Sequence, residues 1–319
     1  MGKHVVFLGS YMHCIFAGGA AIPRAGETLT GDHYVVDYGG KGSTQAMAAA
    51  VMGTDVKYIG KLGDDPEGQQ AIDLFDSFGL IETDRIEIDP GSHTGIALIL
   101  TDHAGNNAIS VVPGVNNRFT QADIDRHEAV IRGADLMAFV LETNYEAVAY
   151  GVKKAHALGV KTFLDPSPAM AIGADVYACL DYIKPNEYEA TVLTGIEVTD
   201  PESAVLAGRA FLDKGVGTAV VTLGALGTVL VTRDGSLHFR TPAVDVVDTT
   251  SAGDVFGGTF ISLVSQGAPL DEAIAYASCA GALATTVAYP ILDVIPTREA
   301  IEAQVRTYKA AGDYVTAIG

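Results

Sequence analysis

The chain contains no tryptophan and few basic residues: 20 Lys and Arg stand against 39 Asp and Glu, a formal net charge of −19. A nucleic-acid-binding protein needs a basic face, so this balance argues against nucleic acid as a partner. It still allows a local anion site, because backbone N–H groups and one or two lysines can hold an anion. We interpret the acidity as a source of solubility.

Cysteine is also scarce. Cys14, Cys179 and Cys279 are too few and too widely spaced for a disulfide framework, and the sequence has no C-x-x-C zinc pattern. This usage predicts a reduced, cytoplasmic setting. No apolar run reaches transmembrane length, and residues 1–10 lack the length and cleavage site of a signal peptide. We therefore expect a cytoplasmic protein that does not bind membranes.

Two common nucleotide-binding motifs are missing. Lys41 is followed by Gly42 rather than by Ser or Thr, so there is no Walker A sequence. No G-x-G-x-x-G follows the first predicted strand, at residues 5–8, which argues against a Rossmann dinucleotide site. Any nucleotide must therefore be bound in another way.

Most of the chain alternates short apolar strands with capped helices, which is typical of a mainly parallel α/β sheet with right-handed crossovers. With 319 residues, 48% of them hydrophobic, the core can be large. The predicted helices are 43–52, 66–78, 120–131, 144–158, 187–193, 201–214, 251–266, 270–287 and 297–310. The predicted strands are 5–8, 57–62, 136–141, 160–164, one ending at 183, 219–223, a hairpin of 228–232 with 237–241, and an extended valine-rich run at 244–247.

Two segments interrupt this alternation. Residues 11–38 carry turn residues and a short strand at 33–37, and residues 92–114 contain a hairpin whose turn is at 102–107. We predict that 11–38 and 92–114 form a small β-lid, inserted in two pieces. The α/β core would then consist of residues 1–10, 39–91 and 115–319.

The hairpin alternates apolar residues, with Ile96, Leu98 and Leu100 on one face. A sheet this small cannot bury both of its faces alone, and edge strands invite pairing. We therefore predict a homodimer formed through the lid. The alternative is a lid that folds only onto its own core.

Ligands of open α/β sheets bind at the carboxyl ends of the strands. Polar and glycine residues gather at those positions, in the segments 9–10, 141–142, 165–166, 184–187, 223–224 and 248–254. The sequence thus predicts one binding edge built from several loops.

The most informative of these loops is Asp248-Thr249-Thr250-Ser251-Ala252-Gly253-Asp254. Ser251, Ala252 and Gly253 precede a predicted helix, where small side chains let an anion approach free N–H groups at the positive end of the helix dipole. Asp254 then lies in the first turn, where a carboxylate suits a general base that takes a proton from an attacking hydroxyl. The alternative is an ordinary N-cap and turn.

Together with residues 38–46 (Tyr-Gly-Gly-Lys-Gly-Ser-Thr-Gln-Ala), this loop resembles the two signatures of the ribokinase-like (PfkB) carbohydrate kinases. Segments 26–28, 185–189 and 222–227 also fit, in family order, so the resemblance covers essentially the whole chain. It is nearest to the ribokinase branch. It implies a three-layer ribokinase-like fold, ATP and Mg²⁺ as cofactors, and phosphorylation of a sugar hydroxyl.

The resemblance also implies roles for individual residues. Asp254 would be the base, and the amides of the three residues before it the anion hole. Glu189 would hold Mg²⁺ through water. Nucleotide would contact Asn186, Thr222, Gly224, Gly227 and Ser278; the sugar would contact Met12, Cys14, Gly40, Lys41, Thr44, Glu142 and Asp254; and a monovalent cation would contact Asp248 and Thr250.

Several of these residues have ordinary structural interpretations. Asn186 and Glu189 have the spacing of a capping box. Residues 222–227 could form a plain strand-to-hairpin turn. Lys41 could be a solvated surface charge, and Glu142 a helix-start carboxylate favoured by the dipole.

The sequence departs from the ribokinase pattern in the sugar pocket. Met12 and Cys14 stand where ribokinases have Asn and Asp, and Thr44 where they have Asn. Neither Met nor Cys binds a hydroxyl as Asn and Asp do, so we expect an enzyme that is not optimised for D-ribose. The candidates are a deoxypentose and a larger ketose that reaches His13 or Thr44. The alternative is that nearby polar groups compensate and ribose is accepted. Ser251 replaces a Gly or Ala, a small change. Residues 288–294 lack the usual basic, glycine and serine positions, which leaves activation by K⁺ open.

Two other functions remain open at this point. One is a sugar- or nucleotide-binding protein that has kept the fold and lost turnover. The other is a kinase for a nucleoside or another small alcohol, because a fold does not determine a substrate. The intact Asp254 favours a kinase.

Overall fold

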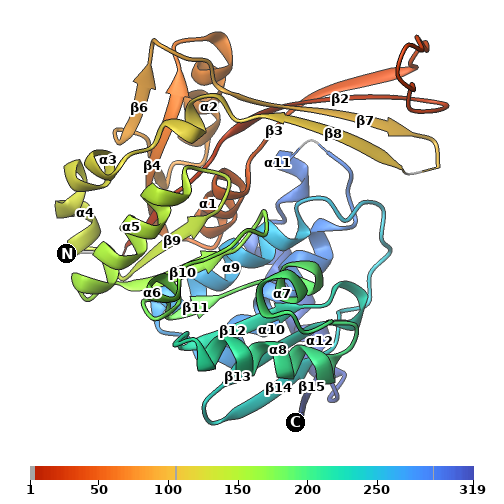
Figure 1. The fold of residues 1–319 in the computed structure, drawn as a ribbon. Helices are drawn as coiled ribbons and strands as arrows, with labels where there is room; N and C mark the ends of the chain where they lie inside the picture. The colour runs from red at the N-terminus through yellow and green to blue at the C-terminus, as the bar shows by residue number, and fades with distance from the viewer. Residues whose placement is uncertain (1–3, 105, 290) are drawn as a thin grey trace.

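The computed structural model describes residues 4–104, 106–289 and 291–319. Residues 1–3 of the predicted core, Gly105 of the predicted turn and Pro290 of the altered cation loop lie outside these ranges. In the described part, an 11-stranded sheet has the order β15-β14-β13-β12-β11-β10-β9-β1-β4-β5, with β6 also paired to β4 (Figure 1). Its strands are β1 (His4–Leu8), β4 (Asp55–Gly63), β5 (Ile81–Glu82), β6 (Ile86–Asp89), β9 (Leu136–Val140), β10 (Lys161–Asp165), β11 (Tyr182–Ile183), β12 (Thr218–Thr222), β13 (Thr228–Thr232), β14 (Gly235–Phe239) and β15 (Val315–Ala317).

Helices cover both faces of this sheet. Along β1, Val5 and Phe7 join one buried cluster while Val6 and Leu8 join another, because successive side chains of a strand point to opposite faces. The first cluster is completed by α1 (Lys41–Val51), α2 (Pro66–Ser77), α9 (Ala252–Gln266), α10 (Leu270–Ala284) and α12 (Arg298–Ala310). The second is completed by α3 (Gln121–Arg126), α4 (Glu128–Arg132), α5 (Tyr145–Ala157), α6 (Ala174–Tyr177), α7 (Glu187–Thr194) and α8 (Pro201–Asp213). The expected three-layer α/β fold is confirmed, with a sheet that is parallel from β5 to β12 and antiparallel from β12 to β15.

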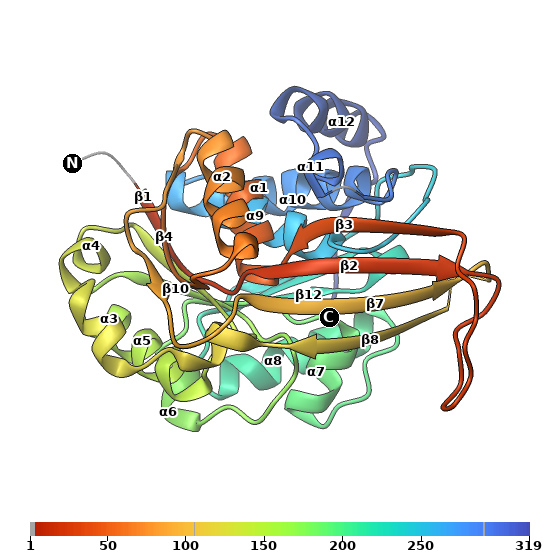
Figure 2. The same cartoon turned by 90° about the horizontal axis from the view of Figure 1, so that it is seen from above.

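A second, four-stranded sheet has the order β3-β2-β7-β8 and joins strands from two distant segments. Its strands are β2 (Met12–Gly19), β3 (His33–Gly39), β7 (Gly95–Asp102) and β8 (Asn107–Val112). They run side by side as a long ribbon that extends beyond the α/β body (Figures 1 and 2). One face of the ribbon, which we call the inner face, contacts the body through a Phe16–Tyr289 ring pair and through hydrogen bonds from Ile291 N to Asp37. The opposite, outer face leaves large apolar side chains exposed, namely Tyr34, Val36, Leu98 and Val112.

Three predicted elements differ from the structure. The helix predicted over 120–131 begins at its Thr120–Asp123 capping box as expected but is broken at His127 into α3 and α4. The run at 244–247 is not a strand: Val246 and Val247 are 62% and 65% exposed, and Val247 N donates to Thr285 O at 2.7 Å. Its valines thus have no neighbouring strand to pack against, and the main chain bonds to the end of α10 instead.

The second hairpin strand, predicted over 237–241, is β14 (Gly235–Phe239). Sequence patterns also missed several short elements: β5, β6, β15, α6, α11 (Ile291–Val294) and the 3₁₀ turns η1 (Gly114–Arg118) and η2 (Gly224–Leu226). Elements of two to five residues are too short to show a hydrophobic period.

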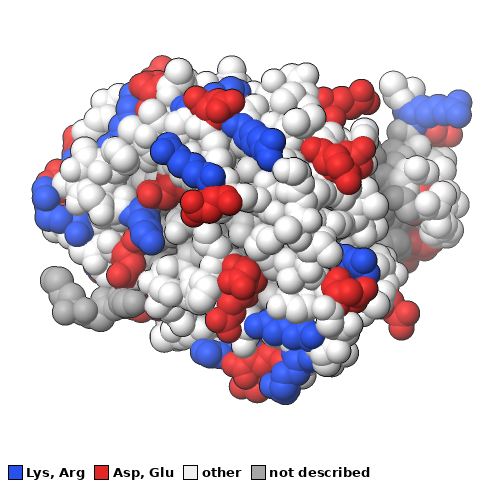
Figure 3. Space-filling view, turned by 90° about the horizontal axis from the view of Figure 1, so that it is seen from below, with Lys and Arg blue, Asp and Glu red and all other residues white. Residues whose placement is uncertain are grey.

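On the face that Figure 3 shows, Lys and Arg are interspersed with Asp and Glu, and no broad basic patch gathers there. Within the described residues, every helix falls short of the length and apolarity that a membrane span requires.

Candidate active site

Four loops at the carboxyl edge of the parallel strands meet at the start of α9. Strands β1, β9, β10, β11 and β12 are parallel neighbours, so their carboxyl ends share one edge. Ser10 Oγ, after β1, donates to Glu142 Oε2, after β9, at 2.5 Å. Lys184 Nζ, after β11, lies 2.9 Å from Asp165 Oδ2 at the end of β10 and donates to Gly253 O at 3.1 Å. The structure therefore brings together residues that the sequence placed in separate loops.

The turn that starts α9 is held in an unusual backbone conformation. Ser251 has φ 62°, the left-handed region, and among the described residues it is the only non-glycine with a positive φ. Ala252 N reaches Thr249 O at 3.3 Å, and the N–H of Gly253 meets no acceptor among the described residues. Such a helix start offers a free N–H and the positive end of the dipole, and an anion such as a phosphoryl group fits both.

Asp254 lies in the first turn of α9, 9% exposed. Its Oδ1 accepts a hydrogen bond of 3.2 Å from Gln45 Nε2, which also donates to Asp165 Oδ2 at 2.8 Å. Burial raises the pKa of Asp254; Lys41 opposes this, Asp165 adds to it, and Lys184 also opposes it. A buried carboxylate with a raised pKa is suited to receive a proton.

The start of α1 forms the neighbouring wall. The backbone N–H of Lys41 donates to Glu142 Oε2 at 2.8 Å, so Glu142 caps α1, a helix far from it in sequence. Gly40 has φ 94°, and a Cβ there would lie 2.8 Å from Ser10 O, which requires glycine. Asp254 is the main cause of a raised pKa at Lys41, so this lysine stays charged beside Asp254. Burial raises the pKa of Glu142 and Lys41 opposes it. Lys41 is half-buried and belongs to a charge cluster with Asp254 and Glu142, so it is not an isolated surface charge.

Met12 and Cys14 lie on the inner face of the four-stranded sheet, 4% and 8% exposed, in a small apolar cluster with Ala97 and Ile99. Burial raises the pKa of the Cys14 thiol to about 12, so the thiol stays neutral. The charges of Asp37 and, less strongly, Glu142 raise this pKa further. Thr44 is buried on α1, next to Gln45.

The residues predicted to contact nucleotide are spread along the same edge. Asn186 Oδ1 accepts from Glu189 N at 2.8 Å and Glu189 Oε2 accepts from Asn186 N at 2.9 Å, so both side chains form the capping box of α7. Thr222 bridges to Asn186 as an isolated parallel pair. Gly224 and Gly227 have φ 50° and 101° around η2, the turn into β13. Asn186 and Glu189 therefore form a capping box, and residues 222–227 form a turn into a hairpin strand, as the structural interpretations predicted. Any contact with nucleotide would be additional to these roles.

Ser278 differs from those residues, because its Oγ is buried on α10 with no hydrogen-bond partner. The position lies three residues before Gly281, where a Cβ would come within 3.1 Å of Ala252 O, so Ser278 faces the start of α9.

The two residues predicted to contact a monovalent cation bond to each other: Asp248 Oδ1 accepts from Thr250 N at 2.9 Å and from Thr250 Oγ1 at 2.7 Å. Within the described ranges, no group of three or more His, Cys, Asp or Glu side chains is arranged to hold a metal ion.

Sequence patterns did not single out Gln45, Asp165 or Lys184 as individual site residues. Each carried a weak signal: Gln45 belongs to the 38–46 motif, Asp165 ends a buried strand, and Lys184 directly follows one. Asp37 carried none. Gln45 Oε1 and Asp165 Oδ1 are also buried without partners, and such atoms mark a place where water or a ligand belongs.

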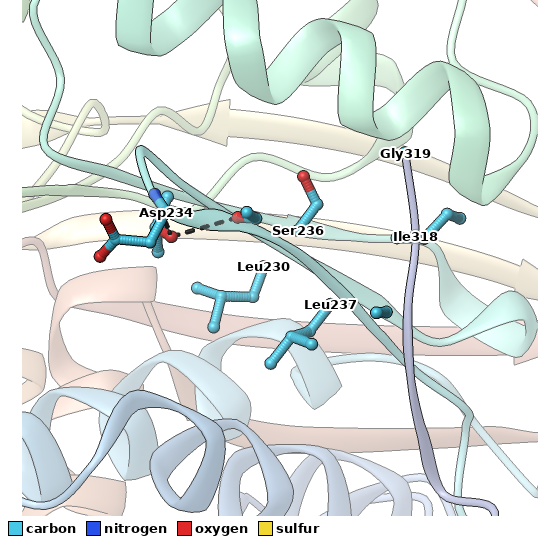
Figure 4. A pocket seen from close by; sticks show the side chains of 9 residues that line it. Leu230, Asp234, Ser236, Leu237, Ile318 and Gly319 are labelled. Carbon is cyan, nitrogen blue, oxygen red and sulfur yellow. Dashed lines mark hydrogen bonds between the residues drawn. The ribbon is translucent and has the colours of Figure 1, made fainter.

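A different hollow, of about 590 Å³, lies between the β13–β14 hairpin and the C-terminal segment (Figure 4). Its lining includes Leu230, Asp234, Ser236, Leu237 and Ile318. Because β13 runs antiparallel to β12, the Asp234 turn lies at the opposite edge of the sheet from Asp254. It has none of the charge cluster described above, so we place the chemistry at the other edge.

The sequence and the fold of this chain are similar to those of known proteins. Residues 3–298 match the pfkB family carbohydrate kinase model. The ribokinase of Haemophilus influenzae is 37% identical over 263 residues, covering 82% of this chain and 86% of that protein, and the deoxyribokinase of Salmonella typhimurium is 32% identical over 283 residues, covering 88% and 92%. The structure of Arabidopsis thaliana ribokinase complexed with ribose and ATP aligns with a TM-score of 0.89 at 26% identity, covering 96% of this chain and 99% of that one. The chain belongs to the pfkB family of carbohydrate kinases.

Proposed function

We propose that this protein transfers the terminal phosphoryl group of ATP to a hydroxyl of a pentose, deoxypentose or ketose, with Asp254 as the general base. The observation that carries the proposal is the buried Asp254 carboxylate in the first turn of α9, beside the free N–H of Gly253. Asp254 would take the proton of the hydroxyl, and the amides of the Ser251–Gly253 turn would hold the transferred group.

The residues around Asp254 contribute to the site in different ways. Lys41 and Lys184 balance the acidic side chains around the base, and Glu142 fixes the start of α1. We further propose that the four-stranded sheet is a lid over the sugar, since its inner face carries Met12 and Cys14 and already contacts residues 289–291 of the body. Closure of such a lid would exclude water from the transfer.

The test is ADP release from Mg-ATP by the purified protein with a panel of pentoses, deoxypentoses, hexoses, ketoses and nucleosides. At least one sugar should raise ADP release well above the rate without acceptor. Release with nucleosides alone would reassign the acceptor class, and no response to any acceptor would favour the non-catalytic alternative.

We expect the reaction to require Mg²⁺, without a tight metal site in the protein alone. Mg²⁺ keeps several waters and is held mainly by substrate phosphates, while Asn186 and Glu189 sit where they could orient those waters. The check is activity in excess EDTA followed by Mg²⁺ repletion, with Mg²⁺ binding to the nucleotide-free protein measured by calorimetry. Full activity in EDTA would contradict this expectation.

We expect a homodimer formed through the outer face of the four-stranded sheet. Tyr34, Val36, Leu98 and Val112 expose a contiguous apolar surface there, which a monomer would leave in water. Leu98→Glu should give a monomer by light scattering at micromolar concentration, whereas the wild type should be a dimer.

The matched control for Leu98→Glu is Leu206→Glu on α8, because the two leucines are 45% and 54% exposed. It adds the same charge at a similar exposure on a helix that is not part of the four-stranded sheet, and it should leave the dimer intact. A wild-type monomer, or a dimer that survives Leu98→Glu, would contradict the proposal.

A further inference from the structure

We propose that Gln45 is a positioning residue, which fixes the Asp254 carboxylate and links it through Asp165 and Lys184 to the turn that starts α9. This inference rests on the proposed role of Asp254 as base. It assigns a task to a side chain that touches the base and not the substrate.

The geometry of one amide group carries the inference. Gln45 is fully buried, and its Nε2 donates to Asp165 Oδ2 at 2.8 Å and to Asp254 Oδ1 at 3.2 Å. An amide nitrogen has two hydrogens, so one can go to each carboxylate. Asp165 Oδ2 also pairs with Lys184 Nζ, which donates to Gly253 O. The base and the carbonyl one residue before it are therefore tied together by a single buried chain of contacts.

The close crossing of α1 and α9 makes this chain of contacts possible. Gly257 and Gly258 lie three and four residues after Asp254, on the same side of α9, and both face Gln45 on α1. A Cβ on Gly257 would lie 3.2 Å from Gln45 Cδ, and one on Gly258 would overlap Gln45 O. The two glycines thus let α1 approach α9 closely enough for the amide to reach the carboxylate.

The contact decides which oxygen of Asp254 is free. With Gln45 on Oδ1, Oδ2 is left to accept the proton of the sugar hydroxyl. The charged groups that face Asp254 are Lys41 on α1, Glu142 after β9, Asp165 at the end of β10 and Lys184 after β11. Lys41 also faces Glu142 and Glu189. Gln45 is the neutral donor of this set, and it stabilises the charged carboxylate against burial and against Asp165.

Two substitutions should therefore shift the pH profile in opposite directions. Gln45→Met keeps the size of the side chain and removes the donor, so the pKa of Asp254 rises and the acid limb of kcat/KM moves up by about one pH unit, with a loss of roughly 10–100-fold in kcat. Asp165→Asn removes the neighbouring like charge and the carboxylate that balances the charge of Lys184. Both changes lower the pKa of Asp254, so the acid limb moves down. A general loss of folding cannot produce opposite shifts.

Thr54→Val is the matched control. Thr54 lies in the turn just after α1, and its Oγ1 lies 2.6 Å from Ser262 Oγ on α9, a buried bond to the same helix α9 but away from the carboxylates. It should leave the pH profile unchanged. A Gln45→Met enzyme with the wild-type profile and kcat, or an upward shift in Asp165→Asn, would overturn the inference; failure of Asp254 as base would show separately, as turnover retained by Asp254→Asn.

Discussion

Replacing Asp254 with asparagine is expected to reduce kcat by roughly 10²–10⁴-fold while ATP and sugar still bind. Asparagine keeps the shape of the side chain, and its amide oxygen can still accept the bond from Gln45 Nε2. It cannot accept the proton of an attacking hydroxyl. The loss should therefore fall on the chemical step and not on binding, because only an interaction used in the transition state is removed.

The measurement is steady-state kcat together with binding of the nucleotide and of the sugar by calorimetry, in the wild type and in Asp254→Asn. Asp245→Asn is a matched control, since Asp245 is an exposed carboxylate just before the same loop. It should leave kcat unchanged. Near-wild-type kcat in Asp254→Asn would remove Asp254 from the role of base, and lost binding of both ligands would point to a structural role.

The second large effect concerns the substrate: we expect kcat/KM for D-ribose to be at least about tenfold below that for the best sugar of the panel. A site that hydrogen-bonds a hydroxyl discriminates strongly because unpaired buried polar groups are costly. The inner face of the four-stranded sheet carries Met12 and Cys14 within an apolar cluster, and neither side chain can satisfy a buried hydroxyl as an amide or a carboxylate can. A deoxypentose, which has no hydroxyl at one of its carbons, or a ketose placed differently, avoids that cost.

The ratio of kcat/KM between two sugars is measured on one enzyme preparation, so the concentration of active enzyme cancels and no separate control is needed. Met12→Asn, which adds a donor and an acceptor to this wall, should raise kcat/KM for ribose relative to the deoxypentose. Cys14→Asp is a less suitable substitution, because Cys14 pairs in register with the buried Asp37. The new carboxylate would therefore face the carboxylate of Asp37. If ribose is the best substrate by tenfold or more, Met12 and Cys14 do not set specificity.

Much of the fold follows from local patterns. Val5 to Leu8 is apolar throughout and forms a strand buried on both faces, and the Thr120–Asp123 capping box starts a helix where it was expected. The turn of small residues before Asp254 likewise starts α9. Each of these features depends on neighbours within a few residues, which is the range over which sequence patterns are informative.

Other features depend on partners far along the chain and could not be predicted. The run at 244–247 has the composition of a strand, but it has no neighbouring strand and bonds to Thr285. Gln45 is a polar residue in a buried helix, and its task appears only when α1 meets Asp165 and Asp254, which are 120 and 209 residues away. Glu142 similarly caps a helix 101 residues away, at Lys41.

The most direct test of the central claim compares ADP released with phosphorylated sugar formed in the same reaction, by enzymatic assay and mass spectrometry. If the site directs a sugar hydroxyl at the phosphoryl group with Asp254 as base, the wild type should form one phosphorylated sugar for each ADP with the best acceptor of the panel, and Asp254→Asn should form almost none. ADP release without phosphorylated sugar, or equal product from both proteins, would contradict it.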